Sequence, residues 1–208
     1  MVEAARVPSA RERGRQARHD RILDAASRLF AEPGFAKTSV DEIASAAGVS
    51  KGLVYDHYDS KEELLAAVFW RLMAQWDHET LRDADFDESD IPGSIGRVMT
   101  ASIRSVRRNR FLQRILTQNI ATLLPQEREN AEAFVRRYCE RLESVLAHGV
   151  RTGQLRADLD TAHTAEIIWA VHHALSPGIL VLPSGEWRAD GDALLESAID
   201  LVIRGIRS

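Results

Sequence analysis

The sequence is poor in cysteine and in positive charge. Cys139 is the one cysteine among 208 residues, so no disulfide can form within the chain, and a reducing compartment such as the cytoplasm is expected. There are 27 Lys and Arg residues against 31 Asp and Glu, which gives a formal net charge of −4. A protein that coats nucleic acid without regard to sequence is usually basic, so any nucleic-acid binding here must depend on local charge.

No secretory signal, transit peptide or membrane span is expected from the sequence. The first residues carry arginines but no apolar core of a signal sequence, and Glu3, Glu12 and Asp20 argue against a transit peptide. The most apolar stretch, AEIIWAVHHALSPGILVL, contains Glu166 and Pro177. It is therefore expected to be a buried helix that bends or ends near its proline, and not a membrane span.

Strand-like alternation is absent, and apolar residues recur with helical spacing through nearly the whole chain. A first helix is predicted over residues 18–32, where Pro33 and Gly34 end it. Further helices are predicted over residues 39–47, 50–57, 61–83, 93–108, 110–123, 126–152, 161–182 and 191–206. The acidic segment DADFDESDIPGS separates the first four helices from the rest. The fold class predicted is all-α, with about nine helices.

Capping signals define the short helices near residue 50. Ser39 and Glu42 form a Ser-x-x-Glu capping box, and Gly48 suits the left-handed residue that ends a helix. Ser50 can cap the next helix, which ends near residue 57. A second capping box at residues 60–63 begins the long helix that follows. Two short helices joined by a tight glycine turn are a helix-turn-helix, whose second helix can lie in the DNA major groove.

The composition of this second helix suits contact with DNA. Gly52 removes a side chain from its first turn, so that the backbone can approach DNA closely. Tyr55 and His57 are flat hydrogen-bonding groups suited to phosphates. Lys61 is slightly unfavourable at a helix N-terminus unless an anion lies there, so it is interpreted as a phosphate contact.

The segment TSVDEIASAAGVSKGLVYDHYDSKEELLAAVF resembles the DNA-binding domain of the tetracycline-repressor-like (TetR) family of bacterial regulators. The resemblance covers about residues 16–70 and rests on Thr-x-x-x-Ile-Ala, Ala-Gly-Val-Ser, the Tyr two residues before His57, and Ser-Lys-x-x-Leu. It implies a homodimer, a ligand pocket in the C-terminal bundle, and release of DNA on ligand binding. By position, the residues expected to contact DNA are Thr38, Ser39, Ser50, Lys51, Gly52, Leu53, Tyr55, His57, Tyr58 and Lys61.

Two residues depart from the family pattern. Tyr58 stands where the family usually has Phe, and its hydroxyl could add a contact. Asp56 places an acid at the end of the second helix of the helix-turn-helix, called the reading helix below. There it would repel a phosphate but could accept a hydrogen bond from a cytosine amine. The preferred DNA sequence is therefore left open.

Several motifs permit a second interpretation. Gly-x-Ser-x-Gly at residues 48–52 resembles a hydrolase nucleophile elbow, but that motif needs a strand before the serine, and a helix is predicted here. The N-terminal arginines suit either a solvated tail or an arm that enters the minor groove. His163, His172 and His173 lack the spacing of a helical metal pair, so packing or pocket lining is favoured and no metal is expected.

The arginine cluster of IRSVRRNRFLQR (residues 103–114) is open to two interpretations, a solvated helix face or a site for an anionic ligand. Cys139 is interpreted as a small hydrophobe and not as a redox sensor. The predicted organisation is a flexible basic arm (1–15), a helix-turn-helix domain (16–60), a connecting helix (61–83) and a helical effector-binding and dimerisation domain (84–208).

Aromatic and sulfur-containing side chains dominate the predicted effector pocket. Its residues are Trp70, Met73, Met99, Ile103, Phe134, Tyr138, Trp169 and His172. The last helix is apolar on more than one side and is expected to pair with the 161–182 helix across a two-fold axis. The predicted interface residues are Ile168, Val171, Leu175, Leu194, Leu195, Ala198, Leu201 and Val202.

The predicted function is a dimeric, ligand-responsive transcriptional regulator, a repressor that a small and largely apolar effector releases from a near-palindromic operator. The alternative is an α-helical enzyme that modifies small molecules and carries an appended helix-turn-helix. No carboxylate pair, triad or metal cluster with catalytic spacing favours the enzyme. No catalytic residue, cofactor or membrane partner is expected.

Overall fold

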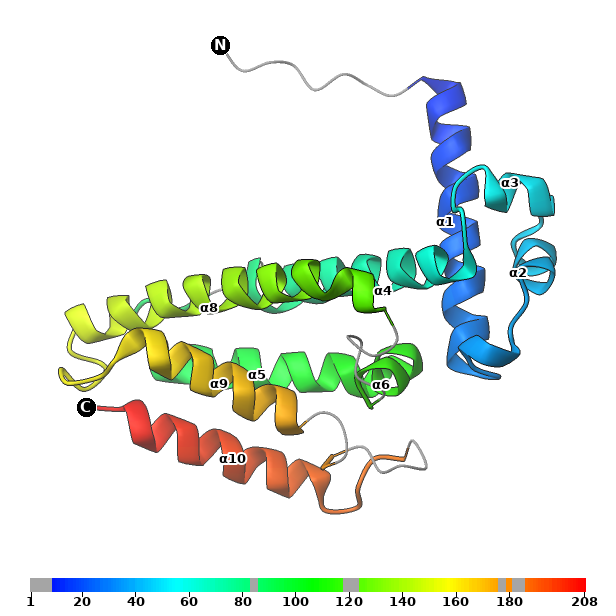
Figure 1. Cartoon of the computed structure of the whole chain (residues 1–208). Helices are drawn as coiled ribbons and strands as arrows, with labels where there is room; N and C mark the ends of the chain where they lie inside the picture. The colour runs from blue at the N-terminus through cyan, green and yellow to red at the C-terminus, as the bar shows by residue number, and fades with distance from the viewer. Residues whose placement is uncertain (1–8, 83–85, 118–123, 176–178, 181–185) are drawn as a thin grey trace, which may run out of the picture. The chain divides into compact units, whose positions relative to one another are not determined.

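The computed structural model describes residues 9–82, 86–117, 124–175, 179–180 and 186–208. Nine α-helices lie within these residues (Figure 1), with one isolated β-bridge between Leu155 and Arg207. The all-α fold class is confirmed. The chain divides into two compact units, residues 1–71 and 72–208, and the division falls within helix α4 (Lys61–Asp77).

The first unit contains α1 (Ala10–Ala31), the 3-10 turn η1 (Phe35–Lys37), α2 (Val40–Ala47), α3 (Lys51–Tyr55) and the beginning of α4. α2 packs against α1 and against α3. Its buried face consists of Ile43, Ala44 and Ala47. Small side chains on this face permit the close crossing that a helix-turn-helix requires.

The capping pattern expected from the sequence is confirmed at α2. The Ser39 side chain accepts from Glu42 N, and the Glu42 carboxylate accepts from Ser39 N. Gly48 has φ 64° and ψ 41°, the left-handed conformation that ends a helix and favours glycine. At the start of α4, Ser60 caps the Glu63 amide, but the Glu63 carboxylate accepts from Asp59 N.

The prediction that residues 1–15 form a flexible arm is wrong for residues 10–15. α1 begins at Ala10 because Ser9 and Glu12 form a third capping box, in which each accepts from the other's backbone amide. Residues 1–8 lie outside the described part of the chain. The arginines at positions 11, 13, 15 and 18 therefore project from a helix and are exposed.

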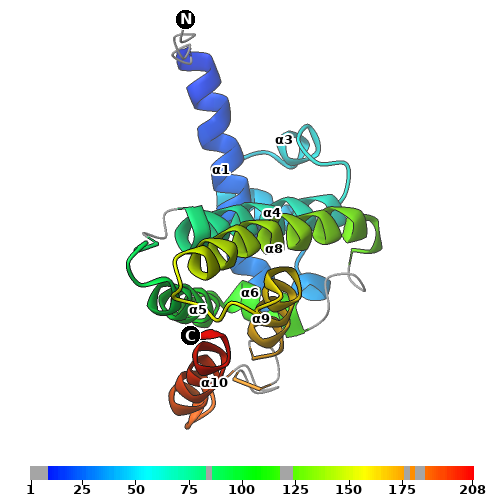
Figure 2. The same cartoon turned by 90° about the vertical axis from the view of Figure 1, so that its left-hand side faces the viewer.

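The second unit is a bundle of long helices (Figure 1). It contains the end of α4, a π-helical turn (His78–Arg82), α5 (Ile91–Arg108), α6 (Arg110–Thr117), the 3-10 turn η3 (Pro125–Glu127), α8 (Arg128–Arg151), α9 (Thr161–Leu175) and α10 (Gly191–Ile206). α8 packs along α9, and α10 packs along α5. Figure 2 views the bundle along its helices, with α10 next to α5 and α9.

The core of the second unit lies between α5, α9 and α10. Ile103, Leu175, Leu180 and Leu195 form a buried cluster with partly buried neighbours. Near the end of α8, a Cβ added to Gly149 would lie 2.7 Å from the Leu155 side chain, so glycine is required for this close approach.

Most predicted helices of this unit agree with the structure in position. The last helix, predicted at 191–206, has those bounds. α4 ends at Asp77, but the chain continues as a π-helix to Arg82, close to the predicted end at residue 83. α9 is described to Leu175, and the predicted bend at residues 176–178 lies outside the described residues. The predicted end of the 110–123 helix also falls outside them, because α6 is described only to Thr117.

Candidate functional site

α3 presents one exposed face. Val54 is buried against the unit, with 1% of its surface exposed, whereas Lys51, Gly52, Tyr55 and Asp56 are exposed. Positions i, i+1, i+4 and i+5 lie on one side of a helix, so these four residues share a face. Leu53 and His57 border it and are half-buried.

The start of α3 is held by a single cap. Ser50 accepts a hydrogen bond from Leu53 N at 3.2 Å, which satisfies one of the free amides at the helix N-terminus. A Cβ added to Gly52 would meet only Ser50 Oγ, 4.0 Å away, within the protein. Packing of the chain therefore does not explain the glycine, and the open backbone faces outward, where another molecule could approach it.

Lys51 is positioned by an ion pair. Its Nζ lies 2.7 Å from Asp41 Oδ2, which comes from the first turn of α2. The hydrogen bond and charge of Asp41 raise the pKa of Lys51, so the ammonium stays charged. The pair links the two helices of the helix-turn-helix and holds a cation beside the exposed face of α3.

Two predicted DNA contacts are not at the surface. Thr38 is 3% exposed, and its hydroxyl donates to the Leu29 and Gly34 carbonyls, so its side chain closes the turn after α1. Tyr58 is 6% exposed, and burial raises its pKa to about 12. Both side chains are occupied inside the unit, which disfavours the predicted contact of these two side chains with DNA.

Lys61 also has partners within the unit. Its Nζ donates to Phe35 O at 3.0 Å and to Thr38 O at 3.1 Å, and it lies 4.3 Å from the centre of the Phe35 ring. These contacts explain a lysine at the start of α4 without DNA. An ammonium group has three donors, so one remains for a phosphate.

His57 lies in a positively charged part of the first unit. Burial lowers its pKa most, and His19, Arg15 and Arg18 of α1 lower it further, whereas Asp56 raises it. The His19 and His57 ring centres are 5.5 Å apart. His57 is therefore neutral at physiological pH and can serve as a hydrogen-bond donor.

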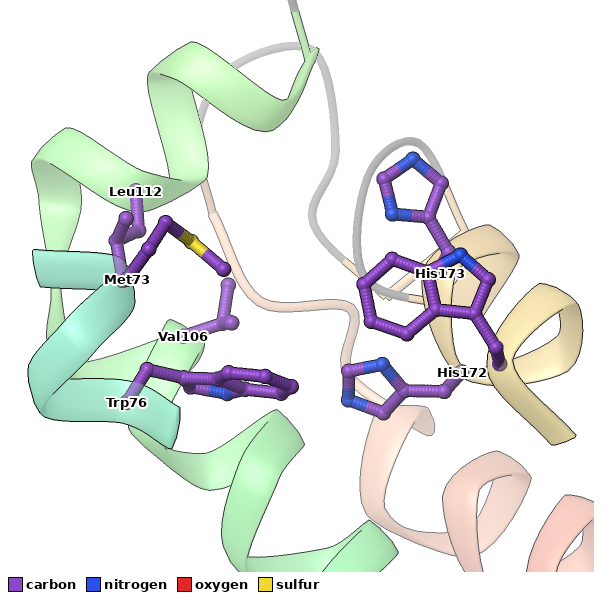
Figure 3. Close-up of a pocket in the computed structure, with 7 residues that line it drawn as sticks. Met73, Trp76, Val106, Leu112, His172 and His173 are labelled. Carbon is purple, nitrogen blue, oxygen red and sulfur yellow. The ribbon is translucent and has the colours of Figure 1, made fainter. Parts of the chain in front are cut away.

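The second unit contains an apolar cavity (Figure 3). The space inside it amounts to about 350 Å³ when the solvent at its open side is included, and its lining comes from α4, α5, α6 and α9. The lining residues are Met73, Trp76, Val106, Leu112, Trp169, His172 and His173.

Three of the predicted pocket residues, Met73, Trp169 and His172, line this cavity, and the others do not. Met99, Ile103 and Tyr138 are 2% exposed or less and belong to the core, while Trp70 lies in the first unit. Phe134 does not line the cavity but packs behind two residues that do, since its ring centre lies 6.1 Å from that of Trp76 and 6.4 Å from that of Trp169.

The sequence did not identify Trp76, Val106 and Leu112 as lining, whereas packing or pocket lining was favoured for His173. Trp76 has the helical spacing of a buried residue, but spacing does not distinguish a core position from the wall of a cavity. Val106 and Leu112 lie among the arginines of residues 103–114. The charge of this segment is its strongest sequence signal, and it does not indicate an apolar lining. Of these arginines, Arg107 pairs with Asp192 at 3.1 Å and lies over the Trp187 ring.

His172 is held by Ser102. Its Nε2 is hydrogen-bonded to Ser102 Oγ, and Ser102 is fully buried. Burial, and to a lesser degree His173, lowers the pKa of His172 to about 4, so the ring is neutral. A Ser–His pair is also the pattern of a nucleophile and its base, but Ser102 does not line the cavity and His172 Nδ1 has no hydrogen-bond partner among the described residues. The pair therefore fixes the ring.

The predicted interface residues fall on different faces of α9 and α10. Ile168, Leu175 and Leu195 are buried in the unit's own core, which disfavours a role for them in an interface. Val171, Leu194, Ala198 and Val202 are half-buried. Leu201 is 75% exposed, and Ile167, which was not predicted, is 58% exposed. Helical spacing from Ile167 to Ala170 and Ala174 was the signal for this outer face.

Cys139 is half-buried, and burial raises the pKa of its thiol. Among the described residues, no group of three or more His, Cys, Asp or Glu is arranged to hold a metal ion. Within the same part of the chain, no helix is both long enough and apolar enough to cross a membrane.

Comparison with known proteins identifies the fold. The model of bacterial regulatory proteins of the tetR family matches residues 22–68, which extend from α1 into α4. Over 187 residues the chain is 27% identical to the HTH-type transcriptional regulator TtgR of Pseudomonas putida, covering 87% of this chain and 89% of TtgR. Residues 22–68 therefore form a DNA-binding domain of the tetR type. The chain is a DNA-binding transcriptional regulator, and α2 and α3 are its helix-turn-helix.

Two solved structures resemble nearly the whole chain in fold. SmeT, the repressor of the Stenotrophomonas maltophilia multidrug efflux pump SmeDEF, is 27% identical with a TM-score of 0.72, covering 93% of this chain and 92% of SmeT. FadR from Bacillus subtilis in complex with stearoyl-CoA has a TM-score of 0.72 at 23% identity, covering 91% of this chain and all of FadR. At that identity the likeness to FadR concerns the fold alone.

Proposed function

We propose that this tetR-family regulator is a repressor that binds a near-palindromic operator as a homodimer and is released by a small, largely apolar effector. The observation that carries the proposal is that one chain has both an exposed reading helix in its first unit and an apolar cavity in its second. The first feature accounts for DNA binding, and the second gives the effector a place to bind.

In this proposal α3 lies in the major groove. Lys51 and Tyr55 are nearest to the bases, and the Gly52 backbone approaches DNA closely. Around this contact, five residues face the sugar-phosphate backbone of the DNA. They are Ser39, Ser50, Leu53, His57 and Lys61. Ser39 and Ser50 are exposed caps whose hydroxyl groups are near free helix amides, an arrangement that favours phosphate.

The effector occupies the cavity between α4, α5, α6 and α9. Its lining is mostly aromatic and aliphatic, which favours a ligand that buries apolar surface. Two relatives support a ligand-responsive repressor. SmeT is the repressor of a multidrug efflux pump, and the FadR structure contains stearoyl-CoA.

The dimer interface consists of the outer faces of α9 and α10. Ile167 and Leu201 are the large apolar side chains exposed there, and small residues surround them at helical spacing. Pairing of these helices with their copies forms a two-fold four-helix interface. The two reading helices then meet half-sites whose centres are about one DNA turn or more apart.

Release requires that effector and DNA share one equilibrium. An effector that prefers one dimer state weakens operator binding, and by linkage the operator weakens effector binding by the same factor. α4 is common to both units, because it begins at Lys61 beside the reading helix in sequence and ends with Met73 and Trp76 of the cavity lining.

The test begins with a gel-shift assay on the DNA that flanks the protein's own coding region. A thermal-shift screen then identifies an effector, and calorimetry measures its dissociation constant with and without operator. We expect the operator to raise that constant several-fold. An effector dissociation constant that is the same in both cases would overturn the proposed switch, and failure to bind any flanking DNA would exclude that DNA as the operator.

A further inference from the structure

Two buried nitrogen atoms in the cavity lining lack a hydrogen-bond partner among the described residues. They are His172 Nδ1 and Trp76 Nε1. His172 is 5% exposed and Trp76 is 3% exposed, so bulk water does not solvate either ring. The ring centres are 5.8 Å apart, and Figure 3 shows the imidazole projecting from α9 toward Trp76. A buried polar group left unpaired is costly, so this arrangement favours a ligand that supplies a partner.

The Ser102 contact determines which His172 nitrogen carries the proton. The Ser102 hydroxyl is fully buried and has no other hydrogen bond among the described residues. Its proton must therefore go to His172 Nε2, because a buried hydroxyl proton without an acceptor would be unsatisfied. An imidazole that accepts at Nε2 and is neutral carries its own proton at Nδ1. His172 Nδ1 and Trp76 Nε1 are then both hydrogen-bond donors.

We infer that the cavity takes an uncharged, largely apolar ligand whose carbonyl oxygen accepts a hydrogen bond from His172 Nδ1–H, with Trp76 Nε1–H as a second donor. The inference rests on the proposed function for its biological meaning, because it names the chemical class of the effector. Ketones, esters, lactones and amides belong to this class, and plain hydrocarbons do not.

Charge on the ligand is disfavoured. Among the described residues, the lining contains no Lys, Arg, Asp or Glu, and burial keeps His172 neutral. A carboxylate would lose its hydration without meeting a cation, and an ammonium ion would find only donors at the polar end. His173 lines the same cavity, but its side chain is exposed and neither of its nitrogens is among the buried atoms without a partner, so a ligand gains less from it.

The first test is the protonation state of His172. Long-range proton–nitrogen NMR spectra of the ¹⁵N-histidine protein distinguish the two neutral ring forms. We expect His172 to carry its proton on Nδ1 in the wild type and to lose this preference in Ser102→Ala. A wild-type ring protonated at Nε2 would overturn the inference, because Nδ1 would then be an acceptor.

The second test uses three probes of nearly equal shape. They are 2-acetylnaphthalene, 2-ethylnaphthalene and 2-naphthoate, which differ in having a carbonyl group, a hydrocarbon group or a carboxylate. Their affinities are measured by calorimetry for the wild type, for His172→Phe, which keeps a flat ring, and for the matched control His173→Phe. Circular dichroism confirms that each variant is folded.

We expect His172→Phe to weaken 2-acetylnaphthalene about two- to tenfold relative to 2-ethylnaphthalene, the size of one net hydrogen bond. His173→Phe leaves that ratio unchanged, and 2-naphthoate binds more weakly than the ketone. Equal losses for ketone and hydrocarbon in His172→Phe, tightest binding of 2-naphthoate, or no binding of any probe by the wild type would each overturn the inference.

These binding measurements use the protein without DNA, so they are independent of the switch. Operator affinity, measured separately by fluorescence anisotropy, reports the proposed function. Selective ketone binding that leaves operator affinity unchanged would support the inference and count against ligand-controlled release. An effector that releases the operator equally well from wild type and His172→Phe would support ligand-controlled release and count against the inference about His172.

Discussion

The phenolic oxygen of Tyr58 lies 2.7 Å from His19 Nε2, and this hydrogen bond joins the segment after the reading helix to α1. The two rings also stack, with centres 5.8 Å apart. The tyrosine hydroxyl, which the sequence suggested as an additional DNA contact, instead fixes the end of the reading helix from inside the unit.

Tyr58→Phe should destabilise the protein. The variant removes the hydrogen bond to His19 Nε2, and His19 Nδ1 has no hydrogen bond among the described residues, so we expect a loss of about 1–3 kcal/mol in the free energy of unfolding. Urea denaturation measures it. Tyr55→Phe is the matched control, because Tyr55 is 46% exposed and should change stability little. Equal stability of both variants would contradict the assigned role of the hydrogen bond.

Alkaline pH should expose the same contact. Burial raises the pKa of Tyr58 to about 12 from an ordinary value of 10.0, so the phenol ionises at lower pH in the unfolded chain than in the folded one. Its contribution to stability is complete below pH 10 and is lost as pH rises from 10 toward 12. The free energy of unfolding should fall less steeply across this range in Tyr58→Phe than in the wild type. Parallel profiles would exclude Tyr58 as the cause.

Lys51→Ala should change which DNA is preferred. If Lys51 reads a guanine, the variant should bind the operator roughly 5- to 150-fold more weakly and tolerate substitution at one base pair. Selection from a randomised DNA library measures this. Asp41→Asn is the control, since it removes the ion-pair partner but keeps the lysine. A uniform loss across all sequences would make Lys51 a phosphate contact.

Lys61 can be tested for two roles at once. Lys61→Ala removes the donor to the Phe35 and Thr38 carbonyls and should cost about 1–3 kcal/mol of stability. Lys61→Gln keeps a donor but no charge, so it should be more stable than the alanine variant. Both should lower the salt slope of DNA binding by about one unit if the third donor holds phosphate. An unchanged slope would leave Lys61 with its structural role alone.

Leu201→Asp should produce a monomer. The side chain is 75% exposed, so its replacement should not disturb the subunit's core, whereas a buried aspartate in a two-fold interface is strongly unfavourable. Sedimentation velocity at micromolar concentration measures the state. Gln126→Asp, an equal charge change at an exposed position on η3, should remain dimeric. A dimeric Leu201→Asp protein would contradict the assigned interface.

Local chemistry made the helix-turn-helix predictable. Ser39, Glu42, Gly48 and Ser50 act through neighbouring backbone atoms, so their spacing in the sequence is sufficient to locate α2 and α3. The same rule places the start of α1, because Ser9 and Glu12 have the same spacing. The arginines around that capping box are also typical of a flexible arm, so composition and capping favour different structures there.

Contacts between distant segments could not be predicted. Thr38 and Tyr58 carry polar groups typical of a DNA-binding surface, but their partners, Leu29 and His19, are known only once α1 packs. Likewise, Ile168 and Ile167 are adjacent apolar residues, and only packing against α8 determines which one is buried. The sequence indicates that a residue is suited to burial or to a polar contact, but it does not identify the distant residue that becomes its partner.

The dispersed lining of the cavity has an evolutionary consequence. Met73, Val106, Leu112 and His172 come from four helices, and none of them caps or ends a helix. Single substitutions can therefore alter ligand choice stepwise while the scaffold persists. The reading surface, in contrast, is concentrated in α3, five residues whose start depends on one serine cap. Descendants of this gene can thus diversify in the signals they sense more readily than in the promoters they control.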